Sequence, residues 1–256
     1  MLNTDTYAYA SQLKVIEPMQ KFIFAILTMG VCLWADNRLI SIAVIIIMSS
    51  IVILRGGTPL PYFLKLISIP MAFLIISAFT IAIGFSIDQQ NFILAIPVAN
   101  FWLGITQSGL QQSINLFFRV LGSVSCLYFL ALSTPMVDLF SVLRKLRLPK
   151  LMIEMMELIY RFIFVLLETA GTMYTAQNSR LGYVNLVSGY RSMGSLVSAL
   201  FIRSYKRSNE LYTSLEARGY DGELRVLEEK YVGNKSLLYM AVGINGLLIL
   251  LASVLK

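Results

Sequence analysis

Long apolar runs separated by short polar breaks constrain the fold of this chain more than any other feature of its sequence. A helix that crosses a bilayer needs about 20 mostly apolar residues. The apolar run over residues 22–54 is too long for one such helix and rather short for two, but the polar break Asp36-Asn37-Arg38 divides it into a tight hairpin of two helices. Only 14% of the 256 residues are charged and 57% are hydrophobic, whereas a soluble domain carries about 25% charged residues. The sequence therefore predicts an all-α integral membrane protein with about five transmembrane helices, two over 22–54 and one each over 62–87, 108–134 and 237–255.

Three interruptions predict where these helices end or bend. The segment from Leu54 to Leu60 combines a charge, two glycines and a proline, which is typical of a turn. Pro70 lies inside the third predicted transmembrane helix, where a kink is tolerated if neighbouring helices satisfy the freed carbonyl. Residues 88–107 contain Asp88, Asn91 and further polar residues, and we expect them to form a loop.

The distribution of positive charge predicts the orientation in the membrane. From Leu66 to Phe118 there is no Lys or Arg, whereas residues 135–235 hold 14 of the chain's 21. By the positive-inside rule the first stretch surrounds an external loop and the second is cytoplasmic, which places the N-terminus on the cytoplasmic side of the cell membrane. Because ten acidic residues are interleaved with these basic ones, the net charge of +7 indicates topology and not nucleic-acid binding. We accordingly divide the chain into 1–134 (N-terminal segment and four transmembrane helices), 135–235 (cytoplasmic helices) and 236–256 (the last transmembrane helix).

The cytoplasmic region is expected to begin with a short amphipathic helix. Thr134 and Pro135 form a good helix start, a capping hydroxyl followed by proline at the first helical position, and Asp138 suits the first turn. Its polar surface is expected to carry Asp138, Arg144, Lys145 and Arg147. The helix lies either along the inner leaflet or against other protein.

Two long helical patterns follow, over 151–180 and 189–218. In the first, Glu154, Glu157, Arg161 and Glu168 form one narrow polar stripe, and Glu157 can pair with Arg161 four residues later. Charges at the centre of a membrane each cost about 2.5–3.5 kcal/mol. We therefore favour a helix packed obliquely at the cytoplasmic face, with a partial membrane span as the alternative.

Both long helices are expected to end alike. Glycine accepts the left-handed conformation that ends many helices, so Gly182 and Gly219 are the expected stops. An arginine near a helix end also complements the helix dipole, which is the purely structural explanation. Two similar ends suggest instead paired projections that present a guanidinium to an acidic partner. The two segments read Ser179-Arg180-Leu181-Gly182-Tyr183 and Glu216-Ala217-Arg218-Gly219-Tyr220.

These residues resemble the transmembrane T component of energy-coupling-factor (ECF) transporters, especially the cobalt-type Q component of the CbiQ family. The resemblance covers nearly the whole chain, and Ala217-Arg218-Gly219 is its most specific motif. The first motif departs from it, because Ser179-Arg180-Leu181 has its glycine one position later, at Gly182. Further matching positions are Asp5, Tyr7, Ser11, Pro18, Lys21, Leu54 to Pro59, Thr134-Pro135 and Arg161-Phe162.

The resemblance implies a non-catalytic scaffold in an ATP-driven importer. The scaffold joins a metal-binding membrane S component to two cytoplasmic ABC-type ATPases, and its arginine-tipped coupling helices contact the ATPases. Cobalt is the implied cargo, with nickel or a vitamin as the alternatives. No metal site or cofactor is expected on this chain, since ATP belongs to the ATPases. The implied contact residues are Arg180 and Arg218 with Ser179, Ala217, Gly182 and Gly219.

Two other protein classes fit the residues less well. A stand-alone permease needs polar groups along its transmembrane helices, where Arg119 is the clearest charge, and Arg119 alternatively pairs with a neighbouring helix. An intramembrane enzyme needs a nucleophile and a base, but the chain has no His, and Cys32 and Cys126 have no evident partner. A phosphate-binding loop is also not indicated, because Ser195-Leu196 stands where that motif requires Lys and Ser or Thr.

Overall fold

The structure is a computed structural model that describes residues 3–35, 37–86, 92–98, 101–220, 231 and 236–254. It divides into two compact parts, the bundle unit (Leu2–Val142 and Lys230–Lys256) and the hairpin unit (Leu143–Glu229). Helices form nearly all of the regular structure, which confirms the predicted fold class. The helices are α1 (Asn3–Ala10), the 3-10 helix η1 (Gln12–Val15), α2 (Pro18–Ala35), α3 (Arg38–Ser50), the π-helix η2 (Ile51–Arg55), α4 (Leu60–Ala82), α5 (Gln107–Ser133), α6 (Met136–Lys145), α7 (Lys150–Ser179), α8 (Leu186–Ala217) and α9 (Ser236–Val254).

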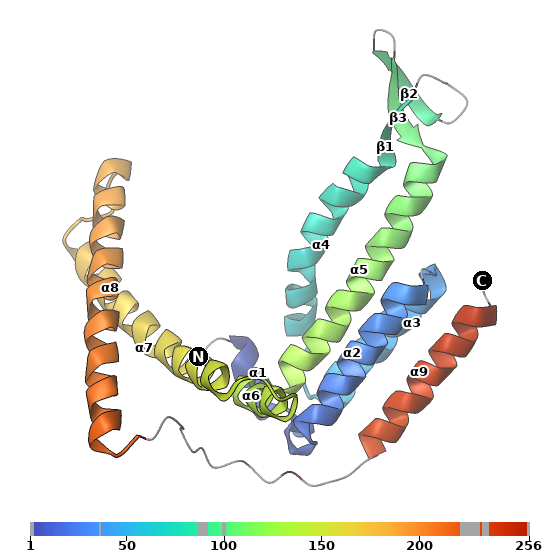
Figure 1. Cartoon of the computed structure of the whole chain (residues 1–256). Coiled ribbons are helices and arrows are strands. Elements are labelled where there is room, and N and C mark those ends of the chain that lie inside the picture. The colour runs from blue at the N-terminus through green and yellow to red at the C-terminus, as the bar shows by residue number, and fades with distance from the viewer. Residues whose placement is uncertain are drawn as a thin grey trace. The chain divides into compact units, whose positions relative to one another are not determined.

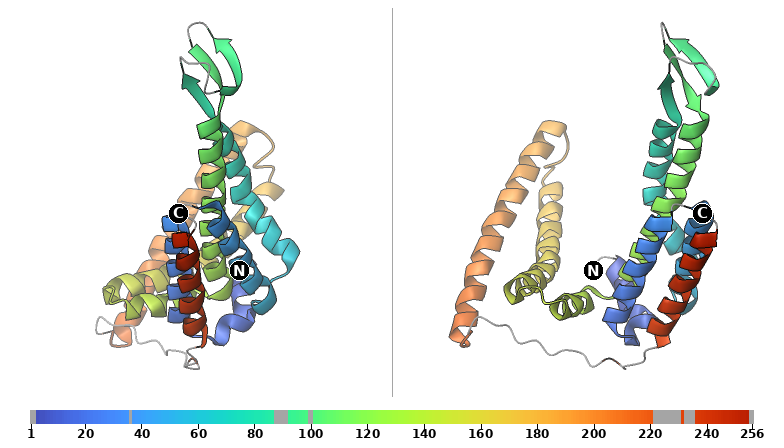
Figure 2. Two further views of the ribbon diagram at one scale, coloured as in Figure 1. Left: turned by 90° about the vertical axis from the view of Figure 1, so that its right-hand side faces the viewer. Right: turned by 45° about the vertical axis from the view of Figure 1, so that its right-hand side comes forward.

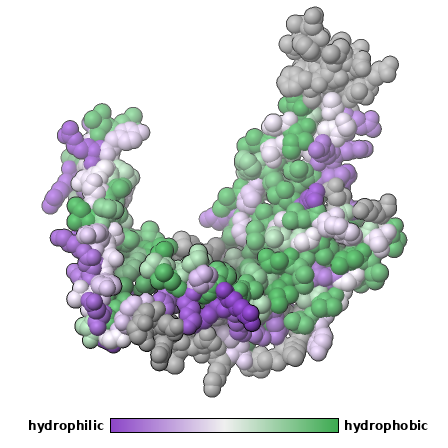
Figure 3. All heavy atoms as spheres, in the orientation of Figure 1, coloured by the Kyte–Doolittle hydropathy of each residue, from purple (hydrophilic) through white to green (hydrophobic). Residues whose placement is uncertain are grey.

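The bundle unit holds the helices that suit a membrane. Among the described residues, α2, the continuous α3–η2 segment, α4 and α5 are long and apolar enough to cross one, and α9 supplies a shorter apolar helix over Leu238–Val254. Each of the five predicted transmembrane segments is therefore an apolar helix. Hydrophobic side chains cover much of the bundle face seen in Figure 3, and α4 exposes Ile69 and Phe73 by 72% and 71%. Such a surface suits contact with lipid.

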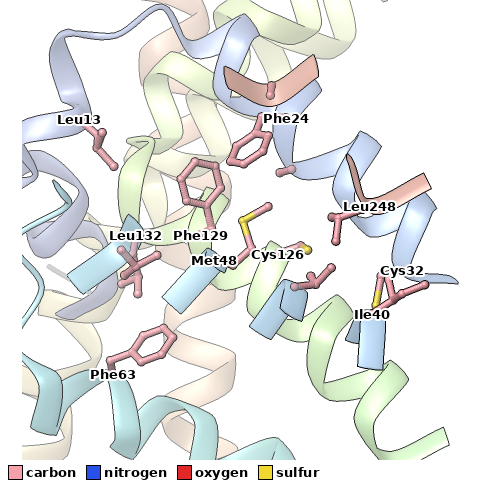
Figure 4. Close-up of a cluster of buried hydrophobic side chains, with 14 of the residues drawn as sticks. Leu13, Phe24, Cys32, Ile40, Met48, Phe63, Cys126, Phe129, Leu132 and Leu248 are labelled. Carbon is pink, nitrogen blue, oxygen red and sulfur yellow. The ribbon is translucent and has the colours of Figure 1, made fainter. Parts of the chain in front are cut away.

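Helix α5 is central to the bundle unit. It packs against α2, α3 and α4, while α9 packs against α2 (Figures 1 and 2). In the core cluster of Figure 4, the rings of Phe24 and Phe129 meet edge to face with centroids 5.4 Å apart. Gly122 permits the close approach of α5 to α2, because a Cβ atom there would lie 2.8 Å from the sulfur of Cys32.

Local chemistry fixes two helix boundaries of the bundle where the sequence predicts, but α4 ends at Ala82, before the predicted end at residue 87, because Ile83 begins strand β1. Asn37, in the predicted polar break, caps α3 by accepting a hydrogen bond from the Leu39 N–H at 3.0 Å. In the predicted turn between the second and third transmembrane helices, Gly57 has a positive φ of 72° that favours glycine. Helix α4 continues through Pro70, as expected for a proline that neighbouring helices tolerate.

A small antiparallel sheet stands where a loop is expected, so the prediction of a loop over 88–107 is wrong for these strands. The sheet has the order β1-β3-β2, with Ile83 opposite Ile105 and Val98 opposite Phe101. Asp88 and Asn91, on which the prediction partly rested, lie outside the described residues. Pro97 fits because β2 is an edge strand, where proline is tolerated. The strands are β1 (Ile83–Ser86), β2 (Phe92–Val98) and β3 (Phe101–Thr106).

The short amphipathic helix is present as α6, with two differences from the prediction. It begins at Met136, one residue later than expected, and the Pro135 carbonyl accepts hydrogen bonds from the N–H groups of Asp138 and Leu139. Asp138 is not on the polar surface, because only 5% of it is exposed. It faces inward, where the hydroxyl of Tyr231 donates a hydrogen bond to it.

The hairpin unit consists mainly of two long antiparallel helices, α7 and α8 (Figures 1 and 2). Helix α8 begins three residues earlier than predicted because Asn185 caps it, accepting a hydrogen bond from the Ser188 N–H at 2.9 Å. Both helices bury few side chains within this unit, among them Ile153 of α7 and Leu196 of α8. Helix α7 is not among the helices long and apolar enough to span a membrane, and its oblique packing at the cytoplasmic face stays a prediction.

Candidate functional site

The end of α7 has the hydrogen-bond pattern of a Schellman motif. Arg180 is the capping residue, with φ −96° and ψ 17°. The next residue, Leu181, is left-handed with φ 61°. The N–H of Gly182 then donates to the carbonyl of Gln177 at 2.9 Å, which is the closing bond of this motif.

The end of α8 repeats this geometry. Arg218 is the capping residue, with φ −94° and ψ 8°, and Gly219 follows with φ 75°. The N–H of Tyr220 donates to the carbonyl of Leu215 at 3.0 Å. The two arginines therefore occupy the same position in the same turn, and both are exposed.

Only one of the two predicted glycine stops acts as expected. Gly219 takes the left-handed conformation, but at the end of α7 Leu181 takes it and Gly182 does not. Gly182 is needed for a different reason: a Cβ atom there would lie 2.9 Å from the Gln177 carbonyl oxygen and 2.7 Å from the Ser192 hydroxyl oxygen. Ser179 and Ala217, which precede the arginines, are exposed.

A polar network surrounds the α7 end and joins it to the beginning of α8. The hydroxyls of Ser188 and Ser192 each donate to the Gly182 carbonyl at 2.9 Å. The Tyr183 hydroxyl donates to the Gln177 side-chain oxygen at 2.7 Å. The Gln177 side-chain nitrogen in turn donates to the Ser192 carbonyl at 3.1 Å. The connection between α7 and α8 is thus fixed by side chains from both helices.

A long-range hydrogen bond attaches the α8 end to the beginning of α7. The Tyr220 hydroxyl donates to a carboxylate oxygen of Glu154 at 3.0 Å, and Glu154 is only 5% exposed. The sequence places Glu154 on a polar stripe, but nothing in the sequence indicates this partner. Glu157 also differs from the expectation, because it pairs with Arg144 of α6 at 3.0 Å and not with Arg161.

The structure does not bring the two arginines together. The 32 residues of α8 lie between them, which corresponds to about 48 Å of helix. Between α7 and α8 lies a hollow of about 670 Å³, with apolar side chains such as Phe162 from α7 and basic ones such as Arg203 and Lys206 from α8. Two separate contact points are therefore available, one at each helix end.

The structure also shows the surroundings of the residues that were considered for a permease or an intramembrane enzyme, Arg119, Cys32 and Cys126. An Nη atom of Arg119 donates a hydrogen bond to the Leu33 carbonyl of α2, which fits its pairing with a neighbouring helix. Cys32 and Cys126 are free thiols buried in the core cluster (Figure 4). Within the described residues, no group of three or more His, Cys, Asp or Glu is placed to hold a metal ion.

Comparison with known proteins identifies the family. A family model described as cobalt transport protein, CbiQ, matches residues 10–228. The chain belongs to this family. Among CbiQ relatives, the cobalt transport protein CbiQ of Salmonella typhimurium is 33% identical over 159 residues, covering 62% of this chain and 71% of that protein.

Two further relatives extend over most of the chain. An uncharacterised protein of Methanocaldococcus jannaschii is 33% identical over 236 residues, 92% of this chain and 86% of that protein. The ECF transporter transmembrane protein EcfT of Streptococcus thermophilus is 26% identical over 218 residues, 81% of this chain and 80% of that protein. The chain is therefore a transmembrane T component of the ECF type, a multi-pass membrane protein of a transporter.

Proposed function

We propose that this CbiQ-family protein couples ATP hydrolysis by two cytoplasmic ABC-type ATPases to a substrate-binding membrane S component, with Arg180 and Arg218 as the contact charges. One observation carries the proposal: both arginines are exposed and occupy equivalent positions in two Schellman motifs. The length of α8 separates them by about 48 Å, which suits one contact with each ATPase. The proposed topology has the N-terminus in the cytoplasm.

The chemistry of arginine suits such a contact. A guanidinium presents several N–H donors in a planar fork that matches a carboxylate, and it stays charged at physiological pH. At a helix end it also offsets the partial negative charge of the last carbonyls. Backbone hydrogen bonds close the turns that follow Arg180 and Arg218, so each arginine lies on a short, ordered projection.

The contacts within the hairpin unit support transmission of motion. Side chains from both helices fix the α7–α8 connection, and Tyr220 attaches the end of α8 to Glu154 near the start of α7. The ion pair between Arg144 and Glu157 joins α6 to α7. We infer that a displacement applied at either arginine moves α7 and α8 together.

The exposed apolar surface of the hairpin unit supports the proposal that other molecules cover this unit in the assembled transporter. Leu151 of α7 and Leu186 and Phe201 of α8 are 64%, 83% and 71% exposed. Apolar surfaces of this kind mark contact with protein or membrane. In the proposed assembly the S component and lipid cover them, and ATP stays on the ATPases, so that this chain holds no cofactor.

Substitution of the arginines tests the coupling role. Loss of one partner from a buried charge pair costs about 2–5 kcal/mol, so Arg180→Ala and Arg218→Ala should each weaken ATPase association, and the double variant should abolish it together with uptake. Arg218→Lys should also impair association, since an ammonium makes no two-pronged contact. Arg191→Ala, an exposed position on α8 outside both motifs, is the matched control. Full association and uptake by the double variant would show the coupling role to be wrong.

Cobalt is the proposed cargo, on the strength of the family description and the Salmonella relative. The test is affinity purification from the native membrane with identification of the co-purifying ATPases and S component, followed by uptake of cobalt, nickel and a vitamin in proteoliposomes. Saturable, ATP-dependent cobalt uptake supports the proposal. Uptake of nickel or of a vitamin alone would assign the chain to another branch of ECF transport.

A further inference from the structure

The polypeptide leaves and re-enters the bundle unit at one buried carboxylate. It leaves within α6, after Val142, and it re-enters at Lys230, next to Tyr231. Asp138, in the first turn of α6, is 5% exposed, and the Tyr231 hydroxyl donates a hydrogen bond to its Oδ1 atom. Asp138 therefore links the outgoing and the returning segments, although 93 residues of sequence separate it from Tyr231.

A buried lysine from α2 completes this junction. Lys21 is 0% exposed, and its Nζ atom donates to the carbonyls of Leu13 at 3.2 Å and Ser133 at 2.8 Å. The ammonium is thereby placed at the negative end of α5. Lys21 thus joins α2 to the end of α5, three residues before α6 begins, and Asp138 joins α6 to Tyr231.

Stability alone does not account for these charges. Burying a charge is costly unless it is paired and hydrogen-bonded, and well-packed apolar side chains often stabilise a protein as much as a buried pair does. Asp138 Oδ2 is buried and has no hydrogen-bond partner in the described part of the chain. What directional hydrogen bonds add is a defined arrangement, because each fixes the position of one segment relative to another.

We propose that Lys21 and Asp138 are positioning residues that fix the end of α5 and the first turn of α6 within the bundle unit, so that motion of the coupling helices reaches the transmembrane helices through α6. At its other end α6 is joined to α7 by the Arg144–Glu157 ion pair. A displacement of α7 is then conveyed along α6 to the ends of α2 and α5. Without the junction, the residues between α5 and α6 absorb the displacement. This inference rests on the proposed coupling function.

The test uses the complete complex with its ATPases and S component in proteoliposomes, and compares cobalt carried per ATP hydrolysed. Lys21→Met and Asp138→Asn should leave ATPase association and hydrolysis in place but lower this ratio roughly 2- to 30-fold, the range seen for substitutions within coupling networks. Tyr231→Phe, which removes one hydrogen bond, should lower it less. Lys65→Met makes the same change at an exposed lysine of α4 and should leave the ratio unchanged.

A double variant separates positioning from folding. Lys21→Met with Asp138→Leu removes both charges and leaves no buried ion, so the thermal stability of the complex should return to the wild-type value while transport per ATP stays low. If a single variant does not assemble, the double variant and Tyr231→Phe are judged by the same ratio. An unchanged ratio in assembled variants, or a double variant that regains both stability and transport, overturns the inference. Failure of the coupling proposal itself is recognised separately, by ATPase binding that survives loss of both Arg180 and Arg218.

Discussion

The two arginine-bearing helix ends have the same backbone conformation but are stabilised in different ways. At the α7 end the left-handed residue is Leu181, and a network of side chains from α8 surrounds the turn. At the α8 end the left-handed residue is Gly219, with open space around it. The comparison shows that the Schellman turn places the arginine, and that a strict Ala-Arg-Gly sequence is one of two ways to obtain that turn.

The largest expected effect is at Gly182, where the comparison predicts a steric penalty. In Gly182→Ala the new Cβ atom meets the Gln177 carbonyl oxygen at 2.9 Å, and overpacking of this kind costs about 1–3 kcal/mol. The last turn of α7 should then open more often, which hydrogen exchange of the amide at position 182 measures in the full-length protein. Gly171→Ala is the control, because nothing lies within 4 Å of a Cβ there and alanine favours the helix. Equal exchange in both variants would contradict the steric role of Gly182.

At Gly219 the expected penalty is smaller and has a conformational cause. A Cβ atom there has open space, but φ is 75°, and a left-handed residue other than glycine costs about 1–2 kcal/mol. Gly219→Ala should therefore speed exchange of the Tyr220 amide. Gly219→Asn should do so less, because asparagine tolerates this conformation. A larger effect for asparagine than for alanine would point to a steric cause at this end as well.

The sequence predicts those parts of the molecule that depend on local chemistry. The five apolar helices follow from the length of the apolar runs, and the turn at Gly57 follows from its glycine and proline neighbours. The two arginine-bearing ends lie within one residue of their predicted positions, because the residues that close a Schellman turn are neighbours in sequence.

What the sequence does not predict depends on distant partners. Leu181, and not Gly182, is the left-handed residue of a turn whose Gly182 carbonyl accepts hydrogen bonds from Ser188 and Ser192 of α8. Asp138 is buried, and its hydrogen-bond donor, the hydroxyl of Tyr231, is 93 residues away in sequence. The strands β2 and β3 form by pairing with each other, which outweighs the loop-like composition of their neighbours.

The hydrogen bond between Tyr220 and Glu154 gives a third prediction. Tyr220→Phe removes the hydrogen bond from the Tyr220 hydroxyl to the buried Glu154 carboxylate, and such a bond contributes about 1 kcal/mol. Exchange at the start of α7 and at the end of α8 should rise together, because the bond joins them. Tyr212→Phe, an exposed tyrosine of α8, should leave both segments unchanged. A rise confined to the α8 end would mean that the attachment does not hold α7.

The smallest expected effect comes from giving the α7 end a left-handed glycine, as the α8 end has. Leu181→Gly gives the α7 end a glycine at its left-handed position. This change removes a conformational penalty of about 1–2 kcal/mol, but glycine loses more chain entropy on folding, which costs about 0.5–1 kcal/mol. Since Leu181 is 71% exposed, little burial is lost, and the Gly182 amide should be protected by about 0.5 kcal/mol more than in the wild type.

Val184→Gly is the matched control for that change, because Val184 is also exposed, by 69%, and is not left-handed. Glycine there brings only the entropic cost of about 0.5–1 kcal/mol, so protection of the same turn should fall. Opposite signs at positions 181 and 184 would confirm that backbone conformation decides the effect at the α7 end. A loss of protection at both positions would instead mean that the surrounding side chains hold Leu181 without strain, and that the two ends differ in more than the residue that turns the chain.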